Sequence, residues 1–432
     1  MTSVTGVLAG AKGRLLPPSI PFRFFAAAAL FHVALWLVLV RNANQVASFR
    51  GGVSPILAAL HVLVLGILTT TAIGAAAQLL PVATRRALAA FWLVKLVFWM
   101  FVPGLVLLTV AMYTGYIALL IVGAALSTAG LLLFAGLLAD NLRRAGSLPV
   151  VAAYGWAALI ALFGVAALGL ALSADFAAGF LPSHFALAHV HMILGAFGFM
   201  GLLVLGFSHI LVPMFALAPA PDKRPAFAGF AAAAAAVAIG ALGAWIESPN
   251  VMTLAACVGL VAAGLHLSLM RRIMQKGMRK RLGLSFILVR AAWIALPLTL
   301  GVGLAAIHER AGPNGPALFG LLLLGGWLLT FLLGILQRIL PFLASMHVAP
   351  AERDGMPQLS QLGTSAPLKV HAICHGSAIL GLTLAIALNA GTVARVASTI
   401  GLVGALSFAV FTADILRRLG PRSPRGIAAH QP

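Results

Sequence analysis

Long apolar runs recur along this chain and are separated by short stretches that hold most of its polar and charged residues. An α-helix needs about 20 consecutive apolar residues to cross the hydrocarbon core of a bilayer. The pattern therefore predicts an all-α membrane protein of about twelve transmembrane helices. We expect the spans at Pro21–Val40, Ser54–Leu80, Ala87–Met112, Gly115–Ala139, Val150–Leu172, His184–Leu217, Ala226–Ile246, Val251–Met270, Leu282–Ile307, Pro316–Met346, Pro367–Leu388 and Val396–Leu416.

Composition strengthens this prediction. Of the 432 residues, 62% are hydrophobic and 8% are charged, whereas about a quarter of a soluble domain is charged. The mean hydropathy is +1.08. We expect one transmembrane domain over residues 21–417, a short N-terminal segment over 1–20 and a basic tail over 418–432. The first 20 residues hold Lys12 and Arg14 but no sustained apolar run, so no cleavable signal is predicted.

Charge placement predicts the orientation. Arg41, Arg50, Arg310 and Arg395 are the basic residues on one side, while the other side holds Arg85, Arg86, Arg143, Arg144, Lys223, Arg224, Arg271, Arg272, Lys276, Arg279, Lys280, Arg281, Arg417, Arg418, Arg422 and Arg425. The positive-inside rule then places both termini in the cytoplasm, in an inner membrane. The net charge of +20 is explained by loops beside anionic headgroups. We expect the bilayer, and not nucleic acid, as the partner.

The second, sixth and tenth spans resemble one another. Each carries glycines along its length. At its inner end each has a polar residue followed, after two or three further residues, by a proline: Gln78 and Pro81, His209 and Pro213, and Gln337 and Pro341. Equal spacing by four helices predicts three four-helix units with pseudo-threefold symmetry.

A histidine motif on the sixth span resembles one found in a known family. Twelve helices, cytoplasmic termini, four-helix units and the run His189-Val-His191-Met-Ile-Leu-Gly195 through Gly206 and Pro213 resemble subunit I of the heme-copper oxidase superfamily. In that family a His-x-His on the tenth helix and a histidine near the outer end of the second helix bind heme. By this resemblance His61, His189 and His191 are the expected heme-binding residues, and the expected cofactors are a b-type heme and also copper.

The chain departs from the oxidase pattern at several positions. The His-x-His lies on the sixth span instead of the tenth, the seventh span lacks paired histidines, and the only tyrosines are Tyr113, Tyr116 and Tyr154. An oxygen reductase of the usual mechanism is therefore not expected. The chain is more similar in kind to the NnrS family linked to nitric oxide metabolism, although that family's His-Glu-Met pattern is absent. The resemblance implies electron transfer or nitric oxide or oxygen metabolism, with an electron donor protein or quinol as partner.

The depths of these histidines support a shared site independently of the family resemblance. His61 lies about seven residues into its span, and His189 and His191 five to seven into theirs, so all three are roughly 10 Å below the outer face. Residues two apart on a helix point about 200° apart, so His189 and His191 cannot easily bind one ion. For any single histidine the competing interpretation is an interhelical hydrogen bond.

A second histidine group is expected toward the cytoplasm. His209 lies near the inner end of the sixth span, and His371 and His375, four residues apart on one helical face, lie at a comparable depth. All three are candidate ligands for copper or another metal that binds imidazole. A solvated, hydrogen-bonded pair is the alternative. Six histidines receive no role: His32, His184, His266, His308, His347 and His430. Three basic residues inside spans, Lys95, Arg290 and Arg338, are expected to snorkel to the interface.

Two functions from different classes stay open. The first is a membrane heme protein, and the second is a permease-like transporter of a small solute or metal ion with histidines along its path. All eight carboxylates lie in loops or near span ends, which argues against proton-coupled transport and proton pumping alike. The chain has no phosphate-binding GxxxxGK[ST] loop and no CxxCH motif, so neither direct ATP use nor a covalently attached heme is predicted. Whether the protein is an enzyme, and its oligomeric state, are not indicated.

Overall fold

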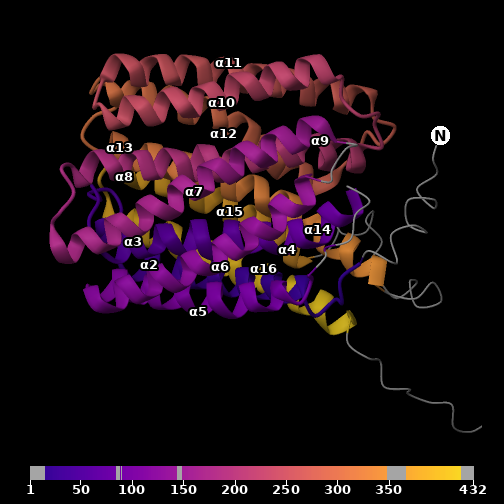
Figure 1. Cartoon of the computed structure of the whole chain (residues 1–432), viewed down its shortest axis with the longest axis horizontal. Coiled ribbons are helices and arrows are strands. Elements are labelled where there is room, and N and C mark those ends of the chain that lie inside the picture. The colour runs from indigo at the N-terminus through magenta and orange to yellow at the C-terminus, as the bar shows by residue number, and fades with distance from the viewer. Residues whose placement is uncertain (1–14, 84–87, 89, 144–147, 348–365, 420–432) are drawn as a thin grey trace, which may run out of the picture.

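A computed structural model describes residues 15–83, 88, 90–143, 148–347 and 366–419. The described residues form helices and no strand (Figure 1): α2 (Pro21–Arg41), η2 (Ala43–Gln45), α3 (Pro55–His61), η3 (Val62–Thr69), α4 (Thr70–Ala83), α5 (Leu93–Thr114), α6 (Ile117–Arg143), α7 (Pro149–Ala178), α8 (His184–Ile193), η4 (Leu194–Gly201), α9 (Leu202–Ala216), α10 (Lys223–Trp245), α11 (Pro249–Lys276), α12 (Gly283–Ile307), α13 (Gly315–Gly320), η5 (Leu321–Leu329), α14 (Thr330–His347), α15 (Ala366–Ala387) and α16 (Gly391–Leu419).

These helices build twelve segments that are long and apolar enough to cross a membrane. The predicted all-α membrane architecture is confirmed, and each predicted span overlaps one of the twelve. The largest shift at the start of a span is in the third, which was expected from Ala87 and begins at Leu93. Ala90 to Trp92 form a turn in which the amide of Leu93 donates to the carbonyl of Ala90 at 3.0 Å. The terminal segments 1–14 and 420–432 lie outside the described residues.

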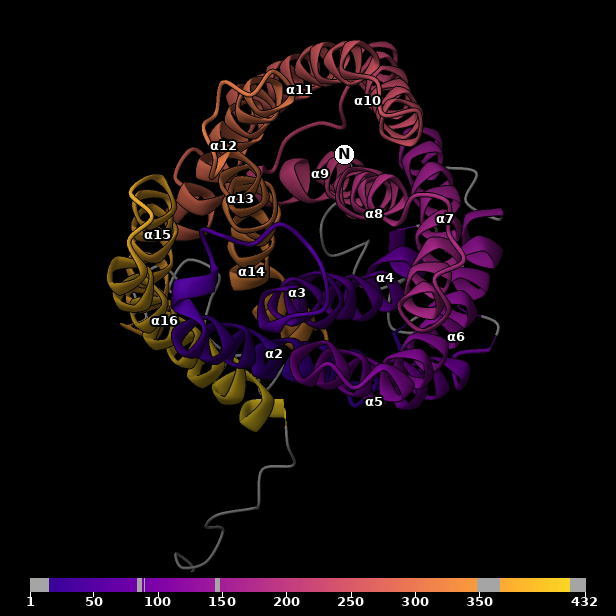
Figure 2. The ribbon, with the colours of Figure 1, turned by 90° about the vertical axis from the view of Figure 1, so that its left-hand side faces the viewer.

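Three of the twelve spans occupy the interior of the bundle. Viewed along its long axis, α3 with α4, α8 with α9, and α13 with α14 are surrounded by the other helices (Figure 2). In these three spans 56–67% of the most apolar 18-residue stretch is buried, against 22–44% in the other nine. The second, sixth and tenth spans are therefore the ones whose side chains can meet inside the protein.

Each interior span contains a π-helical segment: η3, η4 and η5. These segments begin 19, 19 and 20 residues before Pro81, Pro213 and Pro341. A π-helix pairs each amide with the carbonyl five residues back, and such segments often mark functional sites. The wider turn explains why the hydroxyls of Thr69, Thr70 and Thr330 donate to carbonyls five residues earlier, at 2.7–2.8 Å.

The three π-helical segments contact one another at the centre of the bundle. Close approach depends on small residues there. A Cβ on Gly201 of η4 would lie 3.0 Å from the ring of Trp327 of η5, and a Cβ on Gly66 of η3 would lie 2.8 Å from the ring of Phe31 on the neighbouring helix α2. Trp327 is fully buried and packs on Phe197 with ring centroids 5.9 Å apart.

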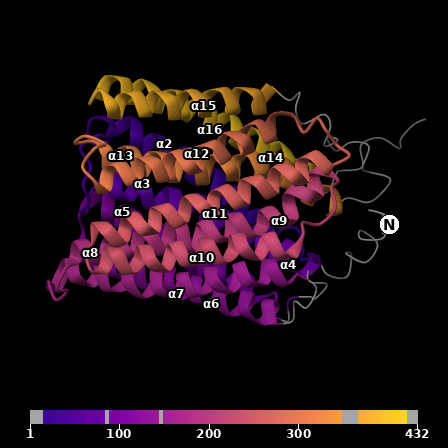
Figure 3. The same ribbon diagram turned by 90° about the horizontal axis from the view of Figure 1, so that it is seen from above.

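The periphery is apolar and outward-facing. Large side chains such as Leu30, Ile160 and Leu380 are at least 70% exposed on the outer helices, which run side by side along the bundle (Figure 3). In a soluble protein such a surface would aggregate, whereas in a bilayer lipid chains cover it. The described chain enters at Pro21 and leaves at Leu419 on the same end of the bundle (Figure 1).

Candidate functional site: three groups of histidines

His61 and His191 meet near the ends of two interior helices, at the end of the bundle that the basic loops predict to face outward. We call these two residues the outer histidine pair. His61 ends α3, directly before η3, and His191 lies in α8, three residues before η4. Their ring centroids are 6.4 Å apart and their ring planes are within 23° of parallel. Both rings are only partly buried. Two of the three predicted heme-binding residues therefore lie side by side, on separate helices.

The orientation of His61 follows from its own helix. Its Nδ1 is 3.0 Å from the carbonyl oxygen of Leu57, one turn earlier. A carbonyl can only accept, so Nδ1 carries the proton and donates it. The lone pair of the neutral ring is then on Nε2, which is left free to bind a metal. A bond of this kind at the second nitrogen is what fixes ring and tautomer in metal-binding histidines.

The His191 ring lies against α7, at a position where that helix has no side chain. A Cβ on Gly169 would come within 3.2 Å of Cε1 of His191 and 3.8 Å of its Nδ1. The ring thus depends on a glycine for its space. Nδ1 of His191 is buried on this side of the ring, against α7.

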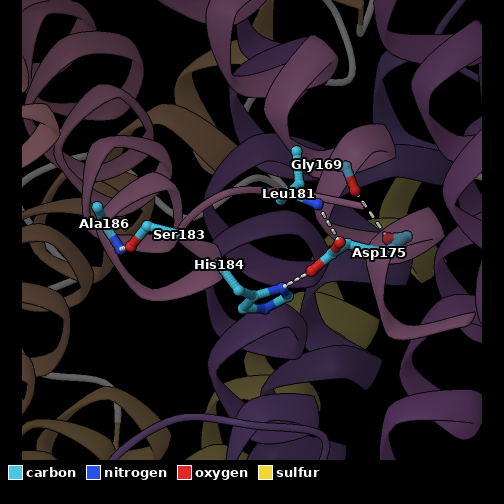
Figure 4. A network of polar contacts seen from close by, with 7 residues as sticks. Gly169, Asp175, Leu181, Ser183, His184 and Ala186 are labelled. Carbon is cyan, nitrogen blue, oxygen red and sulfur yellow. Dashed lines mark hydrogen bonds and ion pairs between the residues drawn. The ribbon is translucent and has the colours of Figure 1, made fainter. Parts of the chain in front are cut away.

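The start of α8 is fixed by a polar network at the outer end of the bundle (Figure 4). Asp175, near the end of α7, accepts from the amide of Leu181 and pairs with Nδ1 of His184, both at 2.7 Å. The hydroxyl of Ser183 accepts from the amide of Ala186 at 3.2 Å and caps α8. This network ties the α7–α8 connection to the helix that carries His191. Asp175 and His184 had been given no role from sequence.

The third predicted heme-binding residue, His189, is not part of the outer histidine pair. Its ring meets the ring of Phe185 edge-on, with centroids 4.3 Å apart. The two-residue separation from His191 turns it to another side of α8. Of the two histidines in the His-x-His phrase, the structure therefore brings one to His61.

His209 has partners that were not predicted. Its ring centroid is 5.8 Å from that of His266 on α11 and 5.4 Å from that of Tyr154 on α7. We call His209 and His266 the α9–α11 histidine pair. Nδ1 of His209 donates to the carbonyl of Leu205 at 2.8 Å. His209 thus packs with these residues, whereas the expected inner metal group joined it with two histidines of α15.

Those two histidines of α15 form a separate group with a residue of α2. His371 and His375 have centroids 5.9 Å apart and planes within 24° of parallel, and His32 is 5.9 Å from His371. We call His32, His371 and His375 the α2–α15 histidine cluster. All three side chains are at most 2% exposed. Of the alternative, a solvated and hydrogen-bonded pair, the hydrogen bonds are present, but the two rings are buried and not solvated.

Each histidine of the cluster is bonded at one ring nitrogen. Nε1 of Trp36 donates to Nε2 of His32 at 3.1 Å. On α14, the hydroxyl of Thr330 lies 2.8 Å from Nε2 of His375, and the side-chain amide of Gln337 lies 3.3 Å from Nδ1 of His371. The other nitrogens have no partner: Nδ1 of His32, Nε2 of His371 and Nδ1 of His375.

Arg338 was expected to snorkel, and that prediction is wrong. Its side chain is 6% exposed and ties α14 to the start of α12. It donates to Ser285 Oγ at 2.6 Å and to the carbonyl of Leu282, and its guanidinium lies over the rings of Phe215 and Phe286. Lys95 and Arg290 are exposed on the outside of the bundle, as snorkelling requires.

Within the part of the chain that the structure describes, no three His, Cys, Asp or Glu side chains are arranged to hold a metal ion together. No protein-family model matches the chain, and no curated protein matches its sequence.

His32 and His266 are the residues that sequence reasoning missed. Each is the single histidine of its span, and its partners lie on other helices. The sequence indicates how deep each histidine lies along its helix. It does not indicate the direction in which the side chain points around the helix axis, and that direction decides which histidines meet.

Proposed function

We propose that this protein is a membrane heme protein in which His61 and His191 would together hold one b-type heme. The observation that carries the proposal is the outer histidine pair: two imidazoles from different interior helices, nearly parallel and 6.4 Å apart between ring centroids. An imidazole nitrogen lies about 2 Å from a bound transition metal. Two imidazoles on opposite sides of one ion then have ring centres roughly 6 Å apart.

The residues of the site fit such a group. His61 presents a free Nε2 because its Nδ1 is bonded to Leu57. The ring of His191 rests in the space that Gly169 leaves beside α7. The partly accessible rings border the apolar interior, which suits a porphyrin face. A bound heme would supply reversible one-electron chemistry and a centre for diatomic gases.

The class of process is electron transfer or the metabolism of nitric oxide or oxygen. This part of the proposal is supported by the resemblance of His61 and of the His189–Pro213 phrase to heme-copper oxidase subunits and by the NnrS-like departures from them. An electron donor protein or a quinol is the proposed partner.

The test is the visible spectrum of the detergent-solubilised protein, produced with ample heme. We expect a Soret band and sharp visible bands on reduction, as for six-coordinate iron. His61→Ala should abolish or greatly weaken the spectrum, because the imidazole has no replacement in the bilayer. His308→Ala is the matched control, since His308 bonds Thr253 at the outer end of the bundle.

A further control separates the two histidines of α8. His189→Ala should leave the spectrum unchanged, because His189 packs against Phe185. Protein that stays colourless, or a spectrum that survives both His61→Ala and a double change at His189 and His191, would contradict the heme assignment. The permease-like function would then be the better account.

We also infer that the chain is built from three four-helix units related by a pseudo-threefold axis. The support is the equal placement of η3, η4 and η5, which begin 19 or 20 residues before a proline in the second, sixth and tenth spans. An experimental structure should superpose these three spans by one repeated rotation. Three unrelated rotations would contradict the repeat.

Both termini are proposed to face the cytoplasm of an inner membrane. The even number of spans places both ends on one side, and the basic loops choose which side. Tags fused to each terminus should report the cytoplasm. A periplasmic signal from either tag would contradict the orientation.

A further inference from the structure

Arg338 carries a positive charge inside the end of the bundle that we propose to face the cytoplasm, and part of its guanidinium group has no partner. The side chain is 6% exposed. Its Nε and Nη2 atoms donate to Ser285 and Leu282, but Nη1 is buried without an acceptor. An arginine has five N–H donors, and the two on Nη1 are unused here. Such a buried donor calls for an explanation, for example a bound ion or ligand.

The charge of Arg338 is also uncompensated within the described part of the chain. Asp175 and Asp414 form the ion pairs there, both with other residues, so no described carboxylate pairs with Arg338. The charged side chain that acts on it is a second cation, Arg279. A buried charge is costly unless a group of opposite charge lies beside it. An anion at this place would remove that cost.

The neighbours of Arg338 lie where several helices end. Its guanidinium group is over the ring of Phe215, the next-to-last residue of α9. The connection between α11 and α12, residues 277–282, crosses the end of α9, where the amide of Arg279 donates to the carbonyl of Ala216 at 3.1 Å. Transmembrane helices end where the hydrocarbon core meets the lipid headgroups. Arg338 is therefore buried at about the level of the headgroups.

Arg279 differs from the other cations around it. The end of α11 and the connection that follows hold six basic residues: Arg271, Arg272, Lys276, Arg279, Lys280 and Arg281. Arg279 is half-buried, whereas the other five are exposed. Two cations that approach each other away from water repel strongly. An anion shared by Arg279 and Arg338 would turn this repulsion into attraction.

We propose that Arg338 and Arg279 together bind one phosphate group. The planar fork of arginine matches phosphate and forms charge-assisted hydrogen bonds with it. One source of the group is an anionic phospholipid of the inner leaflet, because basic pockets between transmembrane helices on the cytoplasmic side bind such headgroups. The other source is a soluble phosphate. The site uses neither the outer histidine pair nor the heme proposal.

Entry of the phosphate requires a small movement of the connection 277–282, because Nη1 of Arg338 is covered by protein atoms. Two backbone hydrogen bonds of 3.1 and 3.3 Å hold the connection against the end of α9. They join Arg279 to Ala216 and Met278 to Leu217. Five of the six basic side chains are exposed beside this place, so they attract an anion toward the covered site.

The competing interpretation is that Arg338 only ties α14 to α12. That role accounts for its Nε and Nη2 atoms. It does not account for Nη1, or for a second arginine that is half-buried beside a buried one. The two interpretations differ in what they predict for Arg279, which the tie between α12 and α14 does not include.

The experiment measures thermal unfolding of the full-length protein after its lipids have been removed in an uncharged detergent. Phosphatidylglycerol, phosphatidylcholine or inorganic phosphate is then added. A ligand that binds only the folded protein raises the melting temperature, and the concentration dependence of the rise gives its affinity. We expect phosphatidylglycerol or inorganic phosphate to raise it, and the one that does so identifies the source. Phosphatidylcholine, which has no net charge, should have a smaller effect.

Matched variants separate the site from the general basic surface. R279Q and R281Q each remove one positive charge from the same connection. R279Q should weaken phosphate binding by roughly 10–100-fold, because charge-assisted hydrogen bonds are lost. R281Q should leave it nearly unchanged, since Arg281 is exposed. R338K keeps the charge but not the planar fork and should weaken binding as well, and R279Q still tests the site if R338K fails to fold.

Weaker binding in R279Q than in R281Q supports the site. Equal losses in these two variants would show attraction by the whole basic surface and would overturn it. The proposal is also overturned if neither phosphatidylglycerol nor inorganic phosphate stabilises the unaltered protein, or if phosphatidylcholine does so equally well. Failure of the heme proposal would leave these results unaffected, because they do not depend on colour.

Discussion

The outer end of the bundle and its inner half hold histidines in contrasting ways. The rings of the outer histidine pair are partly accessible, and His61 is oriented by a carbonyl of its own helix. The α2–α15 histidine cluster is sealed from solvent, and α14 orients two of its rings through Thr330 and Gln337. The two groups therefore differ in exposure and in the helix that orients their rings.

The largest effect is expected from a substitution that disrupts the outer histidine pair and leaves the α2–α15 histidine cluster unchanged. Gly169→Val places a branched side chain where a Cβ alone would already be 3.2 Å from His191. We expect loss of the six-coordinate heme spectrum. Gly136→Val is the control, because nothing lies within 4 Å of a Cβ there. Equal loss in both variants would show a general folding defect instead.

A second prediction compares stability in protein prepared without heme or copper. His375→Ala leaves the buried Thr330 oxygen without its donor and should lower the free energy of unfolding by about 1–3 kcal/mol. His61→Ala removes a partly exposed ring and should cost less than about 1 kcal/mol. Thermal unfolding in one detergent measures both. The reverse order would contradict the contrast between a sealed and an open site.

A third prediction sharpens the account of the inner half. Arg338→Leu removes hydrogen bonds from a charged donor to Ser285 and Leu282, and such bonds contribute about 2 kcal/mol. Arg290→Leu, on the exposed surface of α12, should leave the melting temperature nearly unchanged. If both variants melt alike, Arg338 is not the tie between α12 and α14 that we describe.

The smallest expected effect concerns the polar network that ties the α7–α8 connection to the helix carrying His191. Asp175→Asn weakens the contact with His184 but keeps an acceptor for the amide of Leu181. We expect heme to be retained and to be lost at a temperature lower by a few degrees. A spectrum followed during heating measures this. An unchanged loss temperature would remove the proposed link between this network and α8.

Sequence alone predicted the features that depend on position along a helix. Twelve spans followed from apolar length, and His61 and His191 followed from equal depth below the outer face. The errors concern direction around the helix axis. His189 turned away from His61, His209 met His266 instead of the histidines of α15, and Arg338 pointed inward rather than to the interface. Apolar residues cover every face of these helices, so the sequence has no amphipathic pattern to set that direction.

The π-helical segments were also beyond sequence reasoning. Their i−5 pairing has no strong compositional marker, although Thr69, Thr70 and Thr330 satisfy carbonyls within or at the end of two of them. The last residue of η4 is a glycine, Gly201, and this segment has no threonine. The repeat of glycines and prolines in three spans was visible, but the backbone feature that these spans share was not.

The central claim is that His61 and His191 bind the same iron, and added imidazole tests it most directly. His61→Gly and His191→Gly each remove one ring and leave a cavity beside the iron position. We predict that each variant loses the six-coordinate low-spin spectrum and that free imidazole restores it in both, with His308→Gly indifferent to imidazole. A His191→Gly protein whose spectrum equals that of the unaltered protein, before any imidazole is added, would contradict the claim.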